Sequence, residues 1–170
     1  SSGSSLTAVG ANSLLSNTSG AQNTGVGVGA LQSNTTAQNN TAVGYQAGAA
    51  NTTGYFNTFL GQGAGSNVST GYANIMVGSG AGSIVTSGSG VVAIGYATIS
   101  ASTSTASNNT AVGTYALRAN TTGTFNTAIG TGEYGVEYGP LGYNSTGSYN
   151  TAVGHQALLK NTTASNNTAV

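Results

Sequence analysis

The chain has 170 residues, of which only two are Lys or Arg and two are Asp or Glu, and it contains no cysteine. Ordinary soluble domains have about a quarter charged residues, so this composition excludes the basic surface typical of proteins that bind nucleic acids or anionic membranes. The lack of cysteine excludes disulfides and thiolate metal sites. No run of residues reaches the roughly 18 apolar residues of a membrane span.

A short phrase that ends in glycine, Asn40-Thr41-Ala42-Val43-Gly44 in its fullest form, recurs along the whole chain. Successive closing glycines are 17, 17, 17, 17, 17, 18, 17 and 24 residues apart, at Gly10, Gly27, Gly44, Gly61, Gly78, Gly95, Gly113, Gly130 and Gly154. So strict a period indicates a stacked repeat rather than disorder. The sequence therefore predicts an all-β fold, a β-solenoid or β-roll of about ten 17-residue turns. We interpret residues 1–170 as one repeat array, cut in mid-repeat at both ends, and as a segment of an elongated fibre.

Each phrase predicts a strand, because β-branched residues alternate with small ones. Thr usually stands three residues before the glycine and Val, Ile or Leu one residue before it, with Ala between them. We expect two or three strands of about five residues per turn, with Gly and Asn at corners of positive φ. The β-branched residues are expected to face the core, and the small Ala/Gly face to pack against sister chains. A second apolar column lies four residues after the glycine, at Leu14, Leu31, Ile99, Leu117 and Leu158, and is interrupted by Gly48, Gly65 and Gly82.

Two columns of asparagine accompany the strands. The first directly precedes them and is predicted to form a turn-to-turn amide ladder; its members are Asn23, Asn40, Asn57, Asn74, Asn109, Asn126, Asn150 and Asn167. The second satisfies the Asn-x-Ser/Thr glycosylation pattern, at Asn17, Asn34, Asn51, Asn67 (one place early), Asn120, Asn144 and Asn161. The asparagines of the second column are interpreted either as corner or ladder residues or as glycan carriers. The corner or ladder interpretation is favoured, because short motifs made of residues this common occur often by chance. Aromatic residues just before the first column, Phe56, Phe125 and Tyr149, are expected to stack over the corner.

The period is broken twice towards the C-terminal half. One residue is added within residues 102–108, which predicts a bulge or a looser corner. Seven residues are added between Gly130 and Asn144, which predicts an inserted surface loop over residues 131–143.

The inserted loop is a candidate contact site. It carries Glu133, Tyr134, Glu137, Tyr138 and Tyr143, and Arg118 and Lys160 occupy nearly the same phase on the turns before and after it. Because adjacent turns lie about 4.8 Å apart, all four charges are predicted to gather in one patch. In the favoured interpretation, exposed pairs hold the loop and contribute at most about 1 kcal/mol each. The alternative is a surface for a partner, with the tyrosines stacking on sugar.

Catalysis is not expected. Acid–base chemistry or a metal site needs converging His, Asp, Glu or Cys side chains, and the chain offers His155 and two glutamates. His155 falls in the column of Tyr45 and Tyr96, which predicts a surface residue. We therefore expect no enzyme activity, no metal site and no cofactor.

The stretch Asn-Thr-Ala-Val-Gly-Tyr-Gln-Ala at residues 40–47, with Asn-Thr-Thr-Gly at residues 51–54, resembles the repeats of bacteriophage tail-fibre and related fibre proteins. The strand phrase is also similar to the head repeats of trimeric autotransporter adhesins, in which three left-handed β-rolls pack together. The resemblance covers essentially all 170 residues, although the adhesin head unit is shorter. It implies an extracellular or virion-surface location, and cell-surface carbohydrate is a candidate partner.

Three functions are compatible with these features. The leading hypothesis is a structural shaft of a fibre that supports attachment or adhesion, assembled with copies of itself as a homotrimer or similar bundle. The second is a self-assembling extracellular filament with a glycan-coated surface. The third is an ice-binding solenoid, since Thr columns at strand spacing can order water, but the expectation that Thr points with the core residues disfavours it.

Overall fold

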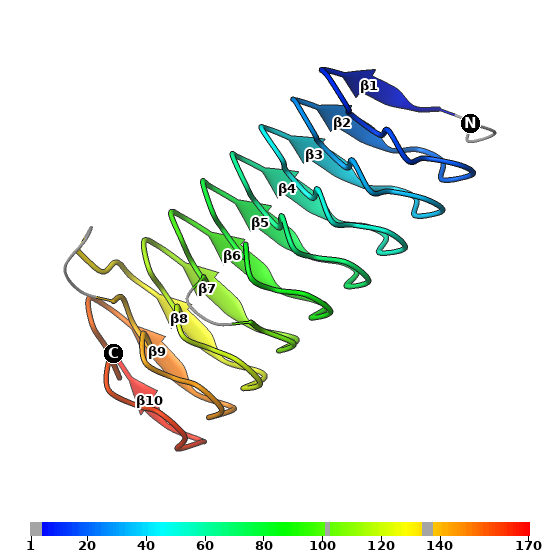
Figure 1. Ribbon diagram of the computed structural model, residues 1–170. Helices are drawn as coiled ribbons and strands as arrows, with labels where there is room; N and C mark the ends of the chain where they lie inside the picture. Colours follow the sequence, from blue (N-terminus) through cyan, green and yellow to red (C-terminus); the bar gives the residue numbers. More distant parts are fainter. Residues whose placement is uncertain (1–4, 101–102, 134–137) are drawn as a thin grey trace.

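The computed structural model describes residues 5–100, 103–133 and 138–170. The described residues contain ten strands: β1 (Thr7–Val9), β2 (Thr24–Val26), β3 (Thr41–Val43), β4 (Thr58–Leu60), β5 (Ile75–Val77), β6 (Val92–Ile94), β7 (Thr110–Val112), β8 (Thr127–Ile129), β9 (Thr151–Val153) and β10 (Thr168–Ala169). All ten form one parallel sheet in chain order, and Figure 1 shows one strand per coil of a stacked rod. The predicted all-β solenoid is confirmed. No helix among the described residues is long and apolar enough to cross a membrane.

The strands are shorter than predicted, with at most three residues in each coil. Glycines end them: Gly44, for example, has φ 136°, and a Cβ placed there would lie 2.5 Å from the Gly61 carbonyl oxygen. Only glycine fits this combination of backbone angle and close approach. The rest of each coil consists of turns that still hydrogen-bond to the next coil, as in Leu31 N–H to Ala47 O (3.0 Å). The wall is therefore bonded throughout without longer strands.

The inward and outward faces of the strands are the reverse of those predicted. The middle residue of every strand from β2 to β9 is buried, and Ala42, Phe59 and Met76 are completely buried. The flanking residues point outward, with exposed fractions of 57% for Val9 and 44% for Ile75. The coil is too thin to hold branched side chains from both walls, because the opposite wall already contributes the second apolar column. The small residues on most strands are therefore core residues and not a contact face for sister chains.

The core is filled by pairing a small residue on one wall with a large residue on the other. Most coils pair Ala or Gly on the strand with a buried Leu or Ile in the second column, as Ala111 is paired with Leu117. The middle coils reverse this pairing. A Cβ on Gly48 would lie 2.5 Å from Phe59 Cδ2, one on Gly65 would overlap the Phe59 ring, and one on Gly82 would overlap the Met76 sulfur.

The second column has a left-handed backbone whichever residue occupies it, with φ 51° at Leu31, 44° at Ile99 and 59° at Gly48. Non-glycine residues rarely adopt this conformation, and β-branched ones least of all. Burial of their side chains in the core holds them there.

The first asparagine column forms the predicted ladder. Asn40 Nδ2 donates to Asn23 Oδ1 (3.2 Å) and to Gly54 O (2.8 Å), while its Oδ1 accepts the Asn57 N–H (2.9 Å). Equivalent bonds to Oδ1 link Asn57 to Asn74, Asn109 to Asn126, Asn126 to Asn150 and Asn150 to Asn167. One buried apolar residue, Val91, takes a ladder position, and its N–H still donates to Asn74 Oδ1 (2.9 Å). The ladder therefore satisfies buried backbone groups at the corner that enters each strand.

Candidate functional site

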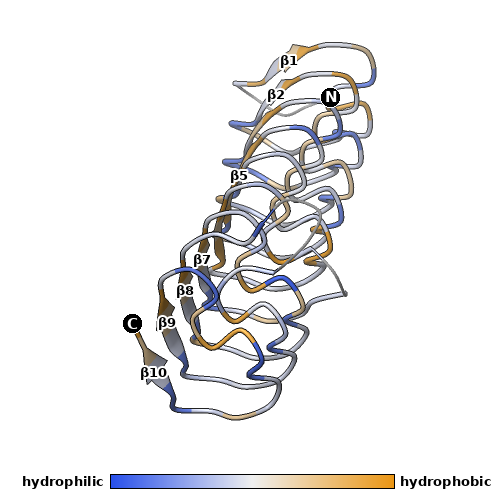
Figure 2. Ribbon diagram, turned by 90° about the vertical axis from the view of Figure 1, so that its left-hand side faces the viewer, coloured by the Kyte–Doolittle hydropathy of each residue, from blue (hydrophilic) through white to orange (hydrophobic). Residues whose placement is uncertain are grey.

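A regular surface is formed by the outward residues of the strands, which we call the outer strand face. It has two columns. The first holds Thr7, Thr24, Thr41, Thr58, Ile75, Val92, Thr110, Thr127, Thr151 and Thr168, and the second Val9, Val26, Val43, Leu60, Val77, Ile94, Val112, Ile129 and Val153. All are exposed or half-exposed, and Figure 2 shows their strands following one another along one side of the rod.

Register and composition give the outer strand face its character. Each residue is paired with its equivalent on the next strand, as Thr41 is with Thr58 and Val43 with Leu60. Rows are therefore about 4.8 Å apart and the two columns about 6.6 Å apart. The face contains no charged side chain, because none of its strand residues is Lys, Arg, Asp or Glu. It offers hydroxyl and aliphatic groups in a regular array, suited to a surface with the same repeat.

The second asparagine column is also a ladder. Asn34 Nδ2 donates to Asn17 Oδ1 (2.7 Å), Asn51 to Asn34 (3.2 Å), Asn144 to Asn120 (3.1 Å) and Asn161 to Asn144 (2.9 Å). The same amides also donate to the carbonyl three residues on, as Asn51 does to Gly54 O (3.1 Å). Asn17, Asn34, Asn51, Asn120 and Asn144 are buried and Asn161 is half-buried. The geometry supports the favoured interpretation of corner and ladder residues.

Asn67 differs from the rest of this column. Val68, not Asn67, occupies the ladder position and is completely buried. Asn67 is exposed and its amide donates to Ser83 O. Because Val68 has no amide to offer, Asn51 Oδ1 is left buried without a hydrogen-bond partner.

The residue after this column explains why the Asn-Thr pair recurs. Its hydroxyl donates to the backbone carbonyl of the equivalent residue on the next coil, as in Thr35 to Thr52 (3.0 Å) and Thr52 to Ser69 (3.0 Å). This hydroxyl ladder runs through Thr18, Thr35, Thr52, Ser69, Thr86, Ser104, Thr121, Ser145 and Thr162. Ser104 keeps the ladder continuous across the coil with one added residue, which is accommodated between Ile99 and Ser104, in an interval that includes residues 101–102 outside the described part.

Glycosylation of this column remains a prediction, and the geometry limits which of its asparagines could accept a glycan. A transferase needs an accessible Nδ2, which the folded chain offers at Asn67 and denies at the buried positions. In a host that modifies Asn-x-Ser/Thr sites, we expect Asn67 to carry a glycan in the folded chain and the five buried asparagines of this column, Asn17, Asn34, Asn51, Asn120 and Asn144, to carry none. Peptide mapping would check this, with Asn67→Gln as the variant that should lose the glycan from the peptide that contains residue 67. Glycan on Asn34 or Asn51 would show that modification precedes folding and breaks the ladder.

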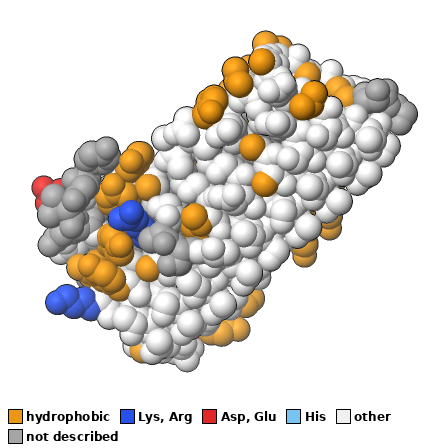
Figure 3. Space-filling model, viewed as in Figure 1, with side chains coloured by type: hydrophobic (Ala, Val, Ile, Leu, Met, Phe, Trp, Pro, Cys, Tyr) orange, Lys and Arg blue, Asp and Glu red, His pale blue; other side chains and the backbone are white. Residues whose placement is uncertain are grey.

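The inserted segment is tied to the solenoid by aromatic and cation–π contacts. The Arg118 guanidinium carbon lies 4.6 Å from the centre of the Tyr115 ring and 4.7 Å from that of Tyr138, and the Tyr138 and Tyr143 rings are 4.6 Å apart. Figure 3 shows the Lys and Arg side chains and the acidic side chain at the same end of the viewed face. In the described residues neither cation forms an ion pair with Glu133. Tyr134 and Glu137 lie outside the described part.

The excursion is shorter than the predicted loop over residues 131–143. Gly139 N–H donates to Tyr115 O (3.1 Å), and Leu117 N–H donates to Pro140 O (3.0 Å). Leu141 is completely buried in the second apolar column. The coil wall therefore resumes at Gly139.

Exposed aromatic residues form short stacks along the corner that precedes the strands. The Phe125 and Tyr149 rings are parallel with centres 5.1 Å apart, and Tyr55 stacks on Tyr72 at 5.0 Å. The stacking predicted for Phe125 and Tyr149 is confirmed, and Phe56 instead meets Tyr55 edge-on at 5.3 Å. His155 is exposed, as predicted, with Nδ1 2.7 Å from Thr131 O.

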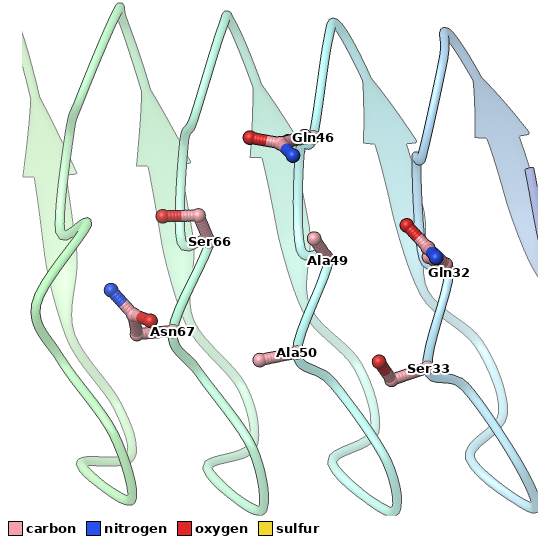
Figure 4. Close-up of a pocket in the computed structure, with 7 residues that line it drawn as sticks. All are labelled: Gln32, Ser33, Gln46, Ala49, Ala50, Ser66 and Asn67. Atoms are coloured by element: carbon pink, nitrogen blue, oxygen red, sulfur yellow. The ribbon is translucent and has the colours of Figure 1, made fainter. Parts of the chain in front are cut away.

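A shallow polar hollow lies on the turn side of the early coils (Figure 4). It is lined by Gln32, Ser33, Gln46, Ala49, Ala50, Ser66 and Asn67. The two alanines leave a gap between the longer polar side chains of the flanking coils. Its polar groups are neutral amides and hydroxyls, which do not indicate any particular class of ligand or reaction. In the described residues no three His, Cys, Asp or Glu side chains form a group that could hold a metal ion.

Comparison of the chain with protein-family models, with curated proteins and with solved structures finds no match in any of the three. The function of the chain is therefore inferred from its own geometry. The surface that sequence reasoning missed is the outer strand face. The residue sizes could have revealed it. The large middle strand residues Phe59 and Met76 occur in the same part of the chain in which the second column is reduced to Gly48, Gly65 and Gly82, which indicates that the middle residues share the core with that column and that their neighbours point outward.

Proposed function

We propose that the chain is a structural shaft segment of an extracellular or virion-surface fibre that supports attachment. The observation that carries this proposal is the unbroken register of ten parallel strands along one axis. The two asparagine ladders and the hydroxyl ladder run parallel to that axis. Nine steps of about 4.8 Å between ten strands give a rod about 43 Å long.

The bonding pattern suits a load-bearing shaft. Every step from one coil to the next is joined by strand hydrogen bonds, by turn hydrogen bonds and by side-chain bonds, as between Asn40 and Asn57 and between Thr35 and Thr52. A pull along the axis therefore loads several parallel bonds at each step. Because each repeat contacts only its neighbours, length grows in proportion to the number of coils.

The glycan-coated filament is less well supported, because five of the seven acceptor asparagines assigned to the second column are buried in the second ladder. If carbohydrate is a binding partner, it would stack on the tyrosines at the inserted segment. The contacts of these tyrosines with each other and with Arg118 can equally serve to hold that segment against the solenoid. A plain shaft needs neither.

Immunogold electron microscopy of the source cells or virions tests the shaft proposal. We expect antibody raised against the purified chain to label thin surface fibres along their length. Preimmune serum is the control. Label confined to the cell interior, or on compact particles without fibres, would contradict the proposal.

A further inference from the structure

We infer that the outer strand face is a self-association surface whose partner is the same face of a second copy of this chain. This deepens the proposed shaft function by naming the partner of the shaft. The surface has exposed aliphatic side chains along its whole length, with exposed fractions of 57% at Val9, 46% at Leu60 and 40% at Ile129. Contiguous apolar surface of this kind is unusual on a monomer and typically marks an interaction site.

The repeat of the face selects its partner. Side chains recur at about 4.8 Å along the rod, so a flat partner must have the same repeat to meet every row. A second copy meets this condition automatically, in the packing of one sheet on another at about 10 Å. The absence of charge on the face removes any repulsion between copies. The threonine hydroxyls are donors as well as acceptors, so like columns can pair with each other.

Ordered water is the competing occupant of this face. The threonine column was predicted to point into the core, but in the structure it faces solvent. Two features favour a protein partner. The threonine column is interrupted by Ile75 and Val92, and the aliphatic column varies between Val, Leu and Ile. Such variation disturbs a match to a rigid lattice, whereas the side chains of a second copy can repack around it.

The size of the face sets the expected strength. A strip about 43 Å long and about 10 Å wide covers about 430 Å² per chain, below the roughly 800 Å² per partner of a standard interface. We therefore expect weak association for this chain, detectable between about 1 µM and 1 mM.

Sedimentation velocity over that range tests the inference, with Val43→Lys/Ile94→Lys as the face variant. Thr53→Lys/Thr122→Lys, at exposed corner positions, is the matched control. We expect wild type and control to associate with rising concentration, and the face variant to need at least about ten times the concentration. Circular dichroism and thermal unfolding should show all three folded. Equal association of face variant and control would overturn the inference.

Cross-linking gives a second, independent measurement because the chain has no cysteine of its own. Val77→Cys, on the central strand β5, should form a disulfide-linked dimer on mild oxidation in either direction of packing, and Thr53→Cys should not. Wild type that stays monomeric to about 1 mM would overturn the inference. Thermal hysteresis in wild type that is lost in the face variant, without association, would instead assign the face to ordered water. None of these results depends on whether antibody labels surface fibres, so the shaft proposal is tested separately.

Discussion

Replacing Phe59 with alanine is expected to lower the free energy of unfolding by about 3–5 kcal/mol. The Phe59 ring is completely buried and fills the space that Gly48 and Gly65 leave on the opposite wall. Alanine would open a cavity bounded by two glycines, which have no side chains with which to close it. Denaturant unfolding followed by circular dichroism would measure the loss. Leu60→Ala is the matched control on the outward side, where we expect a loss below about 1 kcal/mol.

Because Phe59 and Gly65 share one space in the core, a larger residue at position 65 should restore stability lost in Phe59→Ala. Gly65→Leu alone should destabilise the chain by about 1–3 kcal/mol, because the new side chain overlaps the Phe59 ring. The double variant Phe59→Ala/Gly65→Leu recreates the pairing of Ala111 with Leu117, and Leu117 already tolerates φ 50°. We expect a favourable coupling of at least about 2 kcal/mol in the double-mutant cycle. Additive losses would show that the two residues do not share one space.

Replacing Asn40 with aspartate is expected to cost more than about 3 kcal/mol at pH 7. Asn40 Nδ2 donates to Asn23 Oδ1 and Gly54 O, so an ionised carboxylate would place a charged oxygen against two carbonyl oxygens. The protonated acid retains one donor. Burial and these acceptors should therefore raise the pKa of the new carboxyl in the folded chain.

The direction of the pH dependence follows from that raised pKa. The neutral acid fits the ladder, so the variant should be most stable below the unfolded pKa of about 3.9. Stability should then fall by about 1.4 kcal/mol per pH unit until the folded pKa is reached. Denaturant titrations at acid and neutral pH would measure this against a shallow background, since the chain has two glutamates and one histidine. Asn12→Asp, at an exposed position, should change stability by less than about 0.5 kcal/mol. An equal loss at both pH values would contradict a charge buried in the ladder.

The architecture was predictable because the spacing of Gly10 to Gly154 brings equivalent residues of successive coils into contact. The asparagine ladder followed from the same spacing. The direction of the strand faces was not predictable from alternation alone, since a β-branched column fits either side of a strand. The left-handed φ of Leu31 and Ile99 could not be predicted from residue type either, because such residues adopt it only when tertiary packing holds them there.

The candidate sites were predicted less well than the fold. Asn67 carries the same motif as its neighbours, but the residue seven places after Gly61 is Val68, and position rather than motif decides burial. The charged side chains that the structure describes share one end of the viewed face, yet Arg118 is held by tyrosine rings. A guanidinium can pair with a carboxylate or stack on an aromatic ring, and the position of Arg118 within the repeat does not show which of the two it contacts.

The in-register stacking of coils has a consequence for how such a rod can change over generations. Each coil offers its successor the same hydrogen-bonding groups that it takes from its predecessor, as Asn40 does between Asn23 and Asn57. Duplication or deletion of a whole 17-residue unit would leave matching surfaces at the junction, whereas a shift of one residue within a column would not. The added residues fall after Ile99 and after Gly130, and the columns continue on the far side at Ser104 and Leu141. Rod length is thus a heritable quantity that unequal recombination can change in steps of about 4.8 Å without redesign of the core.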